Sequence, residues 1–333
     1  MARFRILHTV MRAKLITVIP VYNGAEFIVQ TLESVSAQTV RPDRVIVQDN
    51  CSTDQTEELV KSFKGFPCEW RRNEKNLGIF GNCNRALELA DQTEYLHFLC
   101  ADDMILPKFY ARLMQELESC AGYGLAYCLD ERIDENNQRL SISGKINGQV
   151  ESQRVEDFMR EKAEISNQAF SGSLIKTAGR KAPCQFRLDL PILADVYFWA
   201  EWARTCERIV RVHEPLVQYR WHGSNETSTF APQLQALILD EWRVMQLLEQ
   251  MRGARPSVVR QFKLKGLFAV RSGIKAKRFR QLNNLDYSRK IVLAARPLSG
   301  SLAWYLAQVL VETRDLLVYT LGGRKRHPKN VYG

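Results

Sequence analysis

Three apolar runs decide the fold of this sequence: LITVIPV at residues 15–21, RVIVQ at residues 44–48 and YLHFLC at residues 95–100. Short, continuous apolar runs are typical of strands that are buried on both faces of a parallel sheet. Between them, residues 26–38 carry apolar side chains at helical spacing, and a second helix is expected over residues 55–63. This alternation predicts an α/β fold with a doubly wound, mostly parallel sheet.

The same pattern continues along the chain. We expect helices at residues 81–90, 103–119, 155–165 and 191–206, and strands at residues 124–129, 138–142 and 209–219. Pro107 would lie near the first turn of its helix, where proline is tolerated. Helical patterns dominate after residue 233, with helices expected at residues 234–251, 258–270 and 302–320. We therefore place a domain boundary near residue 230.

The composition is that of an ordinary globular protein. The 333 residues are 45% hydrophobic and 25% charged, which argues against a disordered, collagen-like or disulfide-scaffold chain. The eight cysteines are scattered and form no C-x-x-C pair. This spacing predicts reduced thiols in a cytosolic compartment and argues against a zinc site.

Neither end of the sequence predicts a membrane span. The N-terminus is basic and precedes an apolar run, but that run is short, ends at Pro20 and is followed by no small-residue cleavage site. We interpret it as the first strand and not as a signal peptide. The late apolar stretch 301–323 contains Glu312, Arg314 and Asp315, whereas a span needs about 20 mostly apolar residues.

The charge is distributed unevenly. Residues 251–333 contain 18 Lys and Arg against 3 Asp and Glu, whereas residues 1–250 contain 29 against 34. A basic segment of this kind commonly binds an anionic surface such as membrane lipid, nucleic acid or an acidic polymer. A solvated, basic helical face is the alternative. Nucleic acid is disfavoured because the sequence has no recognisable reading motif.

The carboxyl ends of the three predicted strands carry residues 20–23, 49–54 and 102–103. The carboxyl ends of parallel strands meet at one edge of a sheet, so these groups should converge on one crevice. Asp102 and Asp103 would repel each other unless a cation or hydrogen bonds compensated their charge. A divalent cation that also binds a substrate phosphate would do so. Alternatively, Asp103 caps the following helix, and the spacing alone does not decide between the two.

Two common nucleotide-binding signatures are absent from the sequence. No G-x-G-x-x-G follows the first strand, and no G-x-x-x-x-G-K-[ST] occurs anywhere. A dinucleotide oxidoreductase and a P-loop NTPase are therefore disfavoured. A phosphate that is held through a metal, and not by a glycine loop, fits what remains.

Several segments of the sequence, taken together, resemble a known family. The segments VIPVYN (18–23), SVSAQT (34–39), IVQDNCSTDQT (46–56) and FLCADD (98–103) are similar, in this order, to the opening of family 2 glycosyltransferases with the GT-A fold. The likeness continues at residues 76–78, Asn84, residues 195–199 and residues 214–222. It covers roughly residues 14–225. The motifs are weak singly, and their order and spacing make the resemblance specific.

The resemblance implies a nucleotide site at the strand ends. The residues implied to bind the nucleotide are Pro20, Tyr22, Asn23, Asp49, Asn50, Asn76 and Asp102. Asn50 and Cys51 stand where the family has aspartate and glycine. An asparagine still offers a donor and an acceptor, but the identity of the base becomes less certain, with UDP favoured and dTDP or GDP as alternatives.

The resemblance also implies a metal and a catalytic base. Asp103 is expected to ligate the cation that bridges the donor diphosphate, and His222 matches a late histidine that completes the metal shell in several family members. Because imidazole suits Mn²⁺ better than Mg²⁺, we expect a divalent cation with Mn²⁺ preferred. Asp195 matches the acid that deprotonates the acceptor in a single inverting displacement, and Asp189 is the alternative base. The family often has further acids where Cys100 and Ala194 stand.

The function implied is transfer of a sugar from a nucleoside diphosphate to a saccharide or lipid-linked saccharide, in the synthesis of a bacterial surface polysaccharide. Residues 1–230 would form the GT-A domain, with a nucleotide-binding half at about 14–120 and an acceptor half at about 121–230. Residues 231–333 would form a basic helical extension. The expected location is cytoplasmic, with the basic region seating the protein peripherally on the inner membrane face or binding an anionic glycan.

Two other functions are considered. A nucleotidyltransferase of related fold should have a glycine-rich loop with Lys or Arg after the first strand, and residues 21–24 (VYNG) lack one. A non-catalytic protein that binds a sugar nucleotide, or forms a scaffold through its basic tail, stays open. An enzyme would lose transfer but keep its affinity for the donor when Asp195 is replaced, whereas a binding protein would have no transfer to lose.

Overall fold

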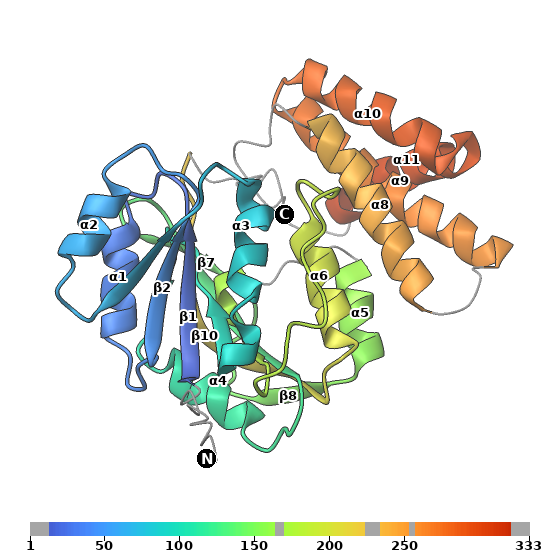
Figure 1. The fold of residues 1–333 in the computed structure, drawn as a ribbon. Helices are drawn as coiled ribbons and strands as arrows, with labels where there is room; N and C mark the ends of the chain where they lie inside the picture. The colour runs from blue at the N-terminus through green and yellow to red at the C-terminus, as the bar shows by residue number, and fades with distance from the viewer. Residues whose placement is uncertain (1–12, 164–169, 224–233, 253–256, 321–333) are drawn as a thin grey trace, which may run out of the picture. The chain divides into compact units, whose positions relative to one another are not determined.

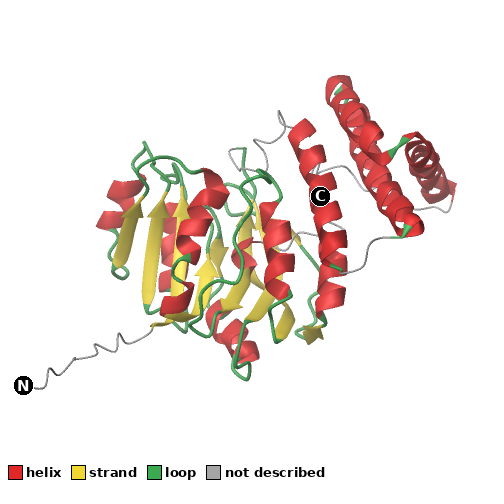
Figure 2. Cartoon of the chain, turned by 45° about the vertical axis from the view of Figure 1, so that its right-hand side comes forward, coloured by secondary structure: helices red, strands yellow, loops and turns green. Residues whose placement is uncertain are grey.

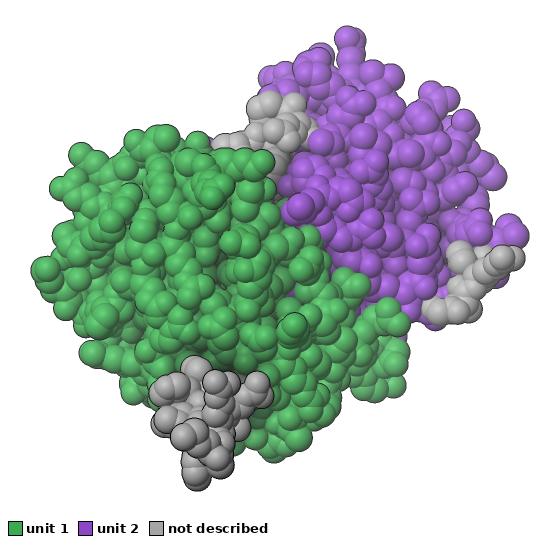
Figure 3. Space-filling view, in the orientation of Figure 1, with its two compact units in different colours: residues 1–158, 167–186, 201–221 green, residues 159–166, 187–200, 222–333 purple. Residues whose placement is uncertain are grey.

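The structure is a computed structural model, and it describes residues 13–163, 170–223, 234–252 and 257–320. Predictions for residues 164–165 and 224–229 lie outside these ranges. The chain divides into two compact units (Figure 3). The first consists of Met1–Phe158, Asn167–Phe186 and Glu201–Trp221, and the second of Met159–Ser166, Arg187–Ala200 and His222–Gly333.

A single mixed sheet forms the centre of the first unit. Its strands are β1 (Ala13–Val21), β2 (Arg44–Asp49), β3 (Cys68–Arg72), β4 (Thr93–Phe98), β5 (Met104–Ile105), β6 (Gly124–Ile133), β7 (Arg139–Ile142), β8 (Val150–Gln153), β9 (Ser173–Lys176) and β10 (Arg208–Arg220). The main order is β3-β2-β1-β4-β9-β6-β10-β5, with β7 beside β6 and β8 beside β10.

The pairings confirm the predicted mostly parallel sheet. The longer registers are parallel: β3, β2, β1 and β4 pair in parallel, as do β6 and β10. Strand β9 runs antiparallel between β4 and β6, and the short strands β5, β7 and β8 also pair antiparallel. Ile16, Val18 and Ile19 of β1 are each fully buried, because a central parallel strand has a neighbouring layer on both faces. The continuous apolar run at residues 15–21 is therefore a central strand, as predicted.

Helices cover both faces of this sheet. They are α1 (Ile28–Ser36), α2 (Thr56–Ser62), α3 (Gly78–Leu87) and α4 (Phe109–Leu117), with short 3₁₀ turns at Ala90–Gln92 and Phe170–Gly172. Figure 1 shows α1 and α2 on one face of the parallel strands and α3 on the other. Helices α5 (Val155–Ala163) and α6 (Ala194–Ala203) each contain residues of both units.

The helix predicted for residues 103–119 is wrong at its start. Residues Met104–Ile105 form β5, which pairs antiparallel with β10, and α4 begins only at Phe109, after Pro107. Proline removes a backbone donor and restricts the residue before it, so it marks the entry to the helix and not its first turn. Asp103 lies between two strands. It therefore does not cap a helix.

The second unit contains helices α8 (Leu234–Met251), α9 (Val258–Gln281), α10 (Leu285–Ser299) and α11 (Ser301–Thr320), drawn in red in Figure 2. Their common core includes Ile238, Met245, Phe268, Ile291 and Trp304. The sequence predicted α8 and α11 but missed α10 and the second half of α9. Within the described ranges, none of the helices has both the length and the apolar character that crossing a bilayer requires.

Candidate nucleotide and metal site

The turns after β1 and β2 are hydrogen-bonded to each other. Asn23, with a left-handed φ of 51°, donates its amide to Ser52 Oγ at 2.8 Å and accepts from the Thr53 amide through Oδ1 at 2.8 Å. The Asn50 amide donates to the Val21 carbonyl at 2.8 Å. These bonds bring together the strand-end residues that the sequence placed at one edge. Tyr22, in the first turn, is 49% exposed.

Asp49 ends β2 and is fully buried. Its carboxylate accepts from the Ser52 amide at 3.0 Å and from Arg72 Nη1 at 2.8 Å. Arg72 also donates to the Ser52 carbonyl at 2.8 Å, so it holds the turn that the carboxylate starts. Sequence reasoning missed Arg72 because it missed β3, the short edge strand that Arg72 ends.

Asn50 is buried and uses its whole side chain within the fold. It donates to Asn76 Oδ1 at 2.8 Å and to the Gly78 carbonyl at 3.2 Å. It accepts from the Leu77 amide at 2.8 Å and from Asn73 Nδ2 at 3.0 Å. Direct contact with a base would require exchange of one of these bonds. Asn50 also places Asn76, which is exposed near the end of the loop into α3, two residues before the helix begins.

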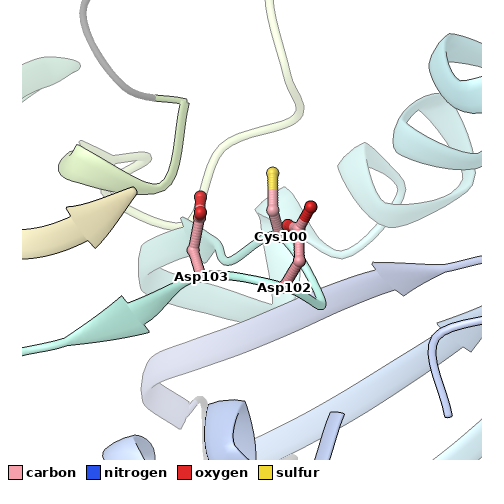
Figure 4. A group of neighbouring side chains, drawn as sticks. All are labelled: Cys100, Asp102 and Asp103. Atoms are coloured by element: carbon pink, nitrogen blue, oxygen red, sulfur yellow. The ribbon is translucent and has the colours of Figure 1, made fainter. Parts of the chain in front are cut away.

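Cys100, Asp102 and Asp103 form a cluster directly after β4. One ligand atom of each, a sulfur or a carboxylate oxygen, lies within 4.8 Å of the others. Figure 4 shows the three side chains extending to the same side of the connection between β4 and β5. Cys100 and Asp102 are partly exposed, whereas Asp103 is fully buried. A ligand could therefore approach from the side of Cys100 and Asp102.

Asp103 is fixed by one bond to each carboxylate oxygen. Ser171 Oγ donates to Oδ2 at 2.6 Å, and the Arg220 amide donates to Oδ1 at 2.9 Å. Burial, together with the neighbouring Asp102 charge, nevertheless raises the pKa of Asp103 well above its usual range. A buried carboxylate beside another carboxylate is costly without a counter-charge. The donor set and its burial therefore fit a divalent cation.

Arg220, the last residue of β10, is fully buried beside this cluster. Its guanidinium donates to the carbonyls of Asp102 at 2.8 Å and Asp134 at 3.2 Å, and to the side chains of Asn137 at 2.6 Å and Gln30 at 3.0 Å. It thus ties the connection carrying the aspartates to α1 and to the turn after β6. The sequence placed Arg220 in a family-like motif but assigned it no role.

Replacement of Arg220 by methionine should destabilise the protein by about 3 kcal/mol or more, because it leaves buried carbonyls without donors. Urea unfolding measures this loss. Arg85→Met is the matched control, because Arg85 is 55% exposed and forms an exposed ion pair with Glu88 at 2.8 Å; it should cost less than about 0.5 kcal/mol. Equal effects of the two changes would contradict the structural role of Arg220.

A series of buried polar side chains is hydrogen-bonded to the carbonyl of Ser171. His97 Nε2 lies 2.9 Å from the Ser171 carbonyl and Nδ1 lies 3.0 Å from the Tyr110 hydroxyl, which is 2.6 Å from Thr17 Oγ1. Burial lowers the pKa of His97 to about 4, so the ring is neutral near pH 7. A carbonyl only accepts, so Nε2 carries the proton and Nδ1 accepts from Tyr110. No sequence signal linked these four residues, which come from four separate segments.

Asp195 lies in the second unit, in the first turn of α6. Burial raises the pKa of its carboxyl to about 6, although the Val196 amide and the charge of Lys162 act in the opposite direction. Its Oδ1 has no hydrogen-bond partner among the described residues. A carboxylate with a raised pKa and an unused oxygen can accept a proton near neutral pH.

The other two predicted residues of the second unit have different surroundings. Asp189 is 58% exposed, and hydrogen bonds from Arg187 at 2.8 and 2.7 Å lower its pKa. An ion-paired carboxylate is a weaker base, so the surroundings favour Asp195 over Asp189. His222 is partly buried at the start of the second unit's last segment. The roles of Asp195 and His222 stay predictions.

Comparison with known proteins identifies the family. Residues 17–172 match the family model described as Glycosyl transferase family 2. An uncharacterized glycosyltransferase of Rickettsia typhi is 26% identical over 229 residues, which cover 66% of this chain and 67% of that protein. The abequosyltransferase RfbV of Salmonella typhimurium is 32% identical over 108 residues, covering 31% of this chain and 32% of that protein.

Solved structures agree on the fold. TarS 1-349 of S. aureus in complex with UDP-GlcNAc has a TM-score of 0.53 and 14% identity, covering 94% of this chain and 93% of that chain. The mannosyltransferase PcManGT of Pyrobaculum calidifontis, in complex with GDP-Man and Mn²⁺, has a TM-score of 0.51 and 16% identity, covering 92% and 81%. The matched segment, residues 17–172, therefore belongs to glycosyltransferase family 2, and the protein has the GT-A fold and is an enzyme, a glycosyltransferase.

Proposed function

We propose that this protein transfers a sugar from a nucleoside diphosphate donor to a saccharide or lipid-linked saccharide, with inversion, by a metal-assisted single displacement. The observation that carries the proposal is the cluster of Cys100, Asp102 and Asp103 at the same sheet edge as the paired turns after β1 and β2. Family membership supports this use of the cluster. Relatives named as an abequosyltransferase and a chondroitin synthase support a saccharide acceptor in polysaccharide synthesis.

The nucleotide is proposed to lie across the ends of β1, β2 and β4. The exposed ring of Tyr22 would lie against the base, with Pro20 and Asn23 beside it. Asp49 and Asn50 would hold the turn at the base through their buried hydrogen bonds, and Asn76 would line the adjoining loop. Asp102 is proposed on the ribose side, since it is partly exposed beside the buried Asp103. UDP is the favoured donor nucleotide, with dTDP and GDP as alternatives.

A divalent cation is proposed to bind Asp103, with His222 as a further ligand. When bound, it would neutralise negative charge on the nucleoside diphosphate that leaves the sugar. Mn²⁺ is preferred in the proposal because imidazole suits it better than Mg²⁺. The chain's own part is to hold Asp103 with one oxygen on Ser171 and the other on the Arg220 amide. The remaining lone pairs of the carboxylate are then free for the cation.

Asp195 is proposed as the base that removes the acceptor hydroxyl proton. The raised pKa of its carboxyl keeps it a stronger base than an ordinary aspartate while leaving it ionised at pH 7. The acceptor oxygen would then attack the anomeric carbon from the face opposite the leaving diphosphate, and the configuration would invert.

This assignment predicts the pH dependence of the rate. Asp195 must be ionised to act as a base, so kcat/KM should fall tenfold per pH unit below about pH 6, where its carboxyl becomes protonated. Initial rates over a pH series, with circular dichroism to check folding, measure this. If Asp189 were the base, its lowered pKa would keep the rate constant well below pH 6. A flat profile through pH 6 would therefore contradict the choice of Asp195.

The basic residues 251–333 are proposed to bind an anionic surface, which would place a cytoplasmic enzyme peripherally at the inner membrane face where lipid-linked acceptors reside. The charge imbalance of the segment supports this.

The proposed activity is tested by incubating the whole protein and Mn²⁺ with UDP-, dTDP- and GDP-sugars and measuring release of the free nucleoside diphosphate. Slow, metal-dependent release from one donor class, accelerated by a saccharide acceptor, is expected. Tight donor binding without any release, with every acceptor offered, would favour the non-catalytic alternative.

A further inference from the structure

An exposed apolar stripe runs along α11. Five of its side chains are well exposed: Leu302 (64%), Tyr305 (68%), Leu306 (45%), Val309 (45%) and Leu310 (60%). Their spacing of three and four residues places them on one face of the helix. We call these five residues the α11 stripe. Contiguous exposed apolar surface of this kind marks an interaction site in an ordinary protein.

The opposite face of α11 is already used. Ala303, Trp304, Ala307 and Val311 are buried, and the indole of Trp304 belongs to the core of the second unit. Residues 302–311 contain no charged side chain, and Gln308 is the one side-chain amide among them. The helix is therefore apolar all round in this stretch. Helices of that kind are normally covered on every side, yet the described part of the chain covers only one.

Cations lie beside the stripe. Lys277 and Arg280 of α9 each bind Glu312 of α11 at 2.8 Å, and Lys277 also donates to the Val311 carbonyl at 3.1 Å. They surround the nearest carboxylate with two positive charges, so this end of the stripe carries a net positive charge. The whole segment 251–333 is also strongly basic, with 18 Lys and Arg against 3 Asp and Glu.

We infer that the α11 stripe inserts into the interfacial layer of an anionic membrane, with the helix lying parallel to the surface. This inference rests on the proposal that residues 251–333 bind an anionic surface, and it specifies the α11 stripe as the part that contacts the lipid. An apolar helix face flanked by cations is the arrangement that binds at the lipid boundary. A second copy of this chain is a poorer occupant, because two basic segments would repel each other, whereas an anionic leaflet attracts them.

Vesicle binding by the whole protein tests the inference. Sedimentation with vesicles of phosphatidylcholine alone, and of phosphatidylcholine mixed with phosphatidylglycerol, is compared for the native chain and two double variants. Leu306→Glu with Leu310→Glu changes the stripe. Leu140→Glu with Leu188→Glu adds the same charge at two other exposed leucines, which are 56% and 66% exposed.

We expect binding to the anionic vesicles only. The stripe variant should lose at least about tenfold in affinity, because binding scales with buried apolar area, and the control should lose less than about threefold. Tyr305→Trp gives a second readout, since its added emission should shift to the blue with anionic vesicles. Circular dichroism checks that each variant is folded.

Other results would overturn the inference in distinguishable ways. Equal vesicle binding by both double variants, abolished by salt, would leave the basic region as a purely electrostatic contact and remove the stripe from it. Absence of vesicle binding by the native chain would overturn both proposals but not the transferase site. A native dimer that the stripe variant dissociates, with vesicle binding unchanged, would make the stripe an interface between copies.

Discussion

Replacement of Asp195 by asparagine is expected to lower kcat by about 10²–10⁴-fold, the usual contribution of a positioned general base. The change keeps the size of the side chain but removes the group that accepts the proton. Affinity for the donor nucleotide should stay within about threefold. The residues proposed to bind the nucleotide belong to the first unit, and this change leaves them intact. Steady-state kinetics and calorimetric titration of the same preparations measure the two quantities.

Asp189→Asn is the matched control for this change. Asp189 is exposed and paired with Arg187, so its loss should leave kcat within about threefold. The opposite order of effects would make Asp189 the base. Equal, small effects of both variants would contradict the assignment of either carboxylate to proton removal.

Replacement of Asp103 by asparagine should lower the affinity for Mn²⁺ by at least about 100-fold, since even residues behind a metal ligand contribute about 10- to 100-fold. In the absence of metal, by contrast, we do not expect the same change to lower the stability of the fold. The raised pKa of Asp103 means that its charge costs free energy in the folded state, so a neutral amide should keep or raise the free energy of unfolding. Mn²⁺ affinity can be followed by the electron paramagnetic resonance of the free ion.

Two further variants make this test specific. Ser171→Ala removes the hydrogen bond at 2.6 Å to Asp103 Oδ2 but leaves the carboxylate, so Mn²⁺ affinity should fall by about 10-fold. Asp130→Asn neutralises a neighbouring buried carboxylate outside the cluster and should change the affinity less than about threefold. If Asp130→Asn weakened Mn²⁺ binding as much as Asp103→Asn, the cation would not be bound at the proposed place.

The central part of the fold was predictable because a strand that is buried on both faces has a continuous apolar sequence. The apolar runs of β1, β2 and β4 follow directly from it. Strand β3 was missed because its residues, CEWRR, are half exposed and mostly polar. The helix expected at Asp103 was wrong because β5 is only two residues long and exists through its pairing with β10.

The position of the site at the strand ends was also predictable from the sequence. The rule that parallel strands end at one edge brought the turns at residues 20–23 and 49–54 together, and the structure confirms that they are hydrogen-bonded. The supporting residues were not predictable. Ser171 and Arg220 reach Asp103 across more than sixty residues of chain, and only the folded sheet places them there. A turn motif also does not show that the Asn50 side chain uses all of its hydrogen-bonding groups within the fold.

Calorimetric titration of the whole protein with UDP, dTDP and GDP, each with and without Mn²⁺, is the most direct test of the proposed nucleotide and metal site. We expect one nucleotide to bind tightly, only when Mn²⁺ is present, and Asp103→Asn to abolish this binding. A folded protein that binds none of the three nucleotides would contradict the proposed donor site. Binding that is equally tight without Mn²⁺ would contradict the role of Asp103 as a cation ligand.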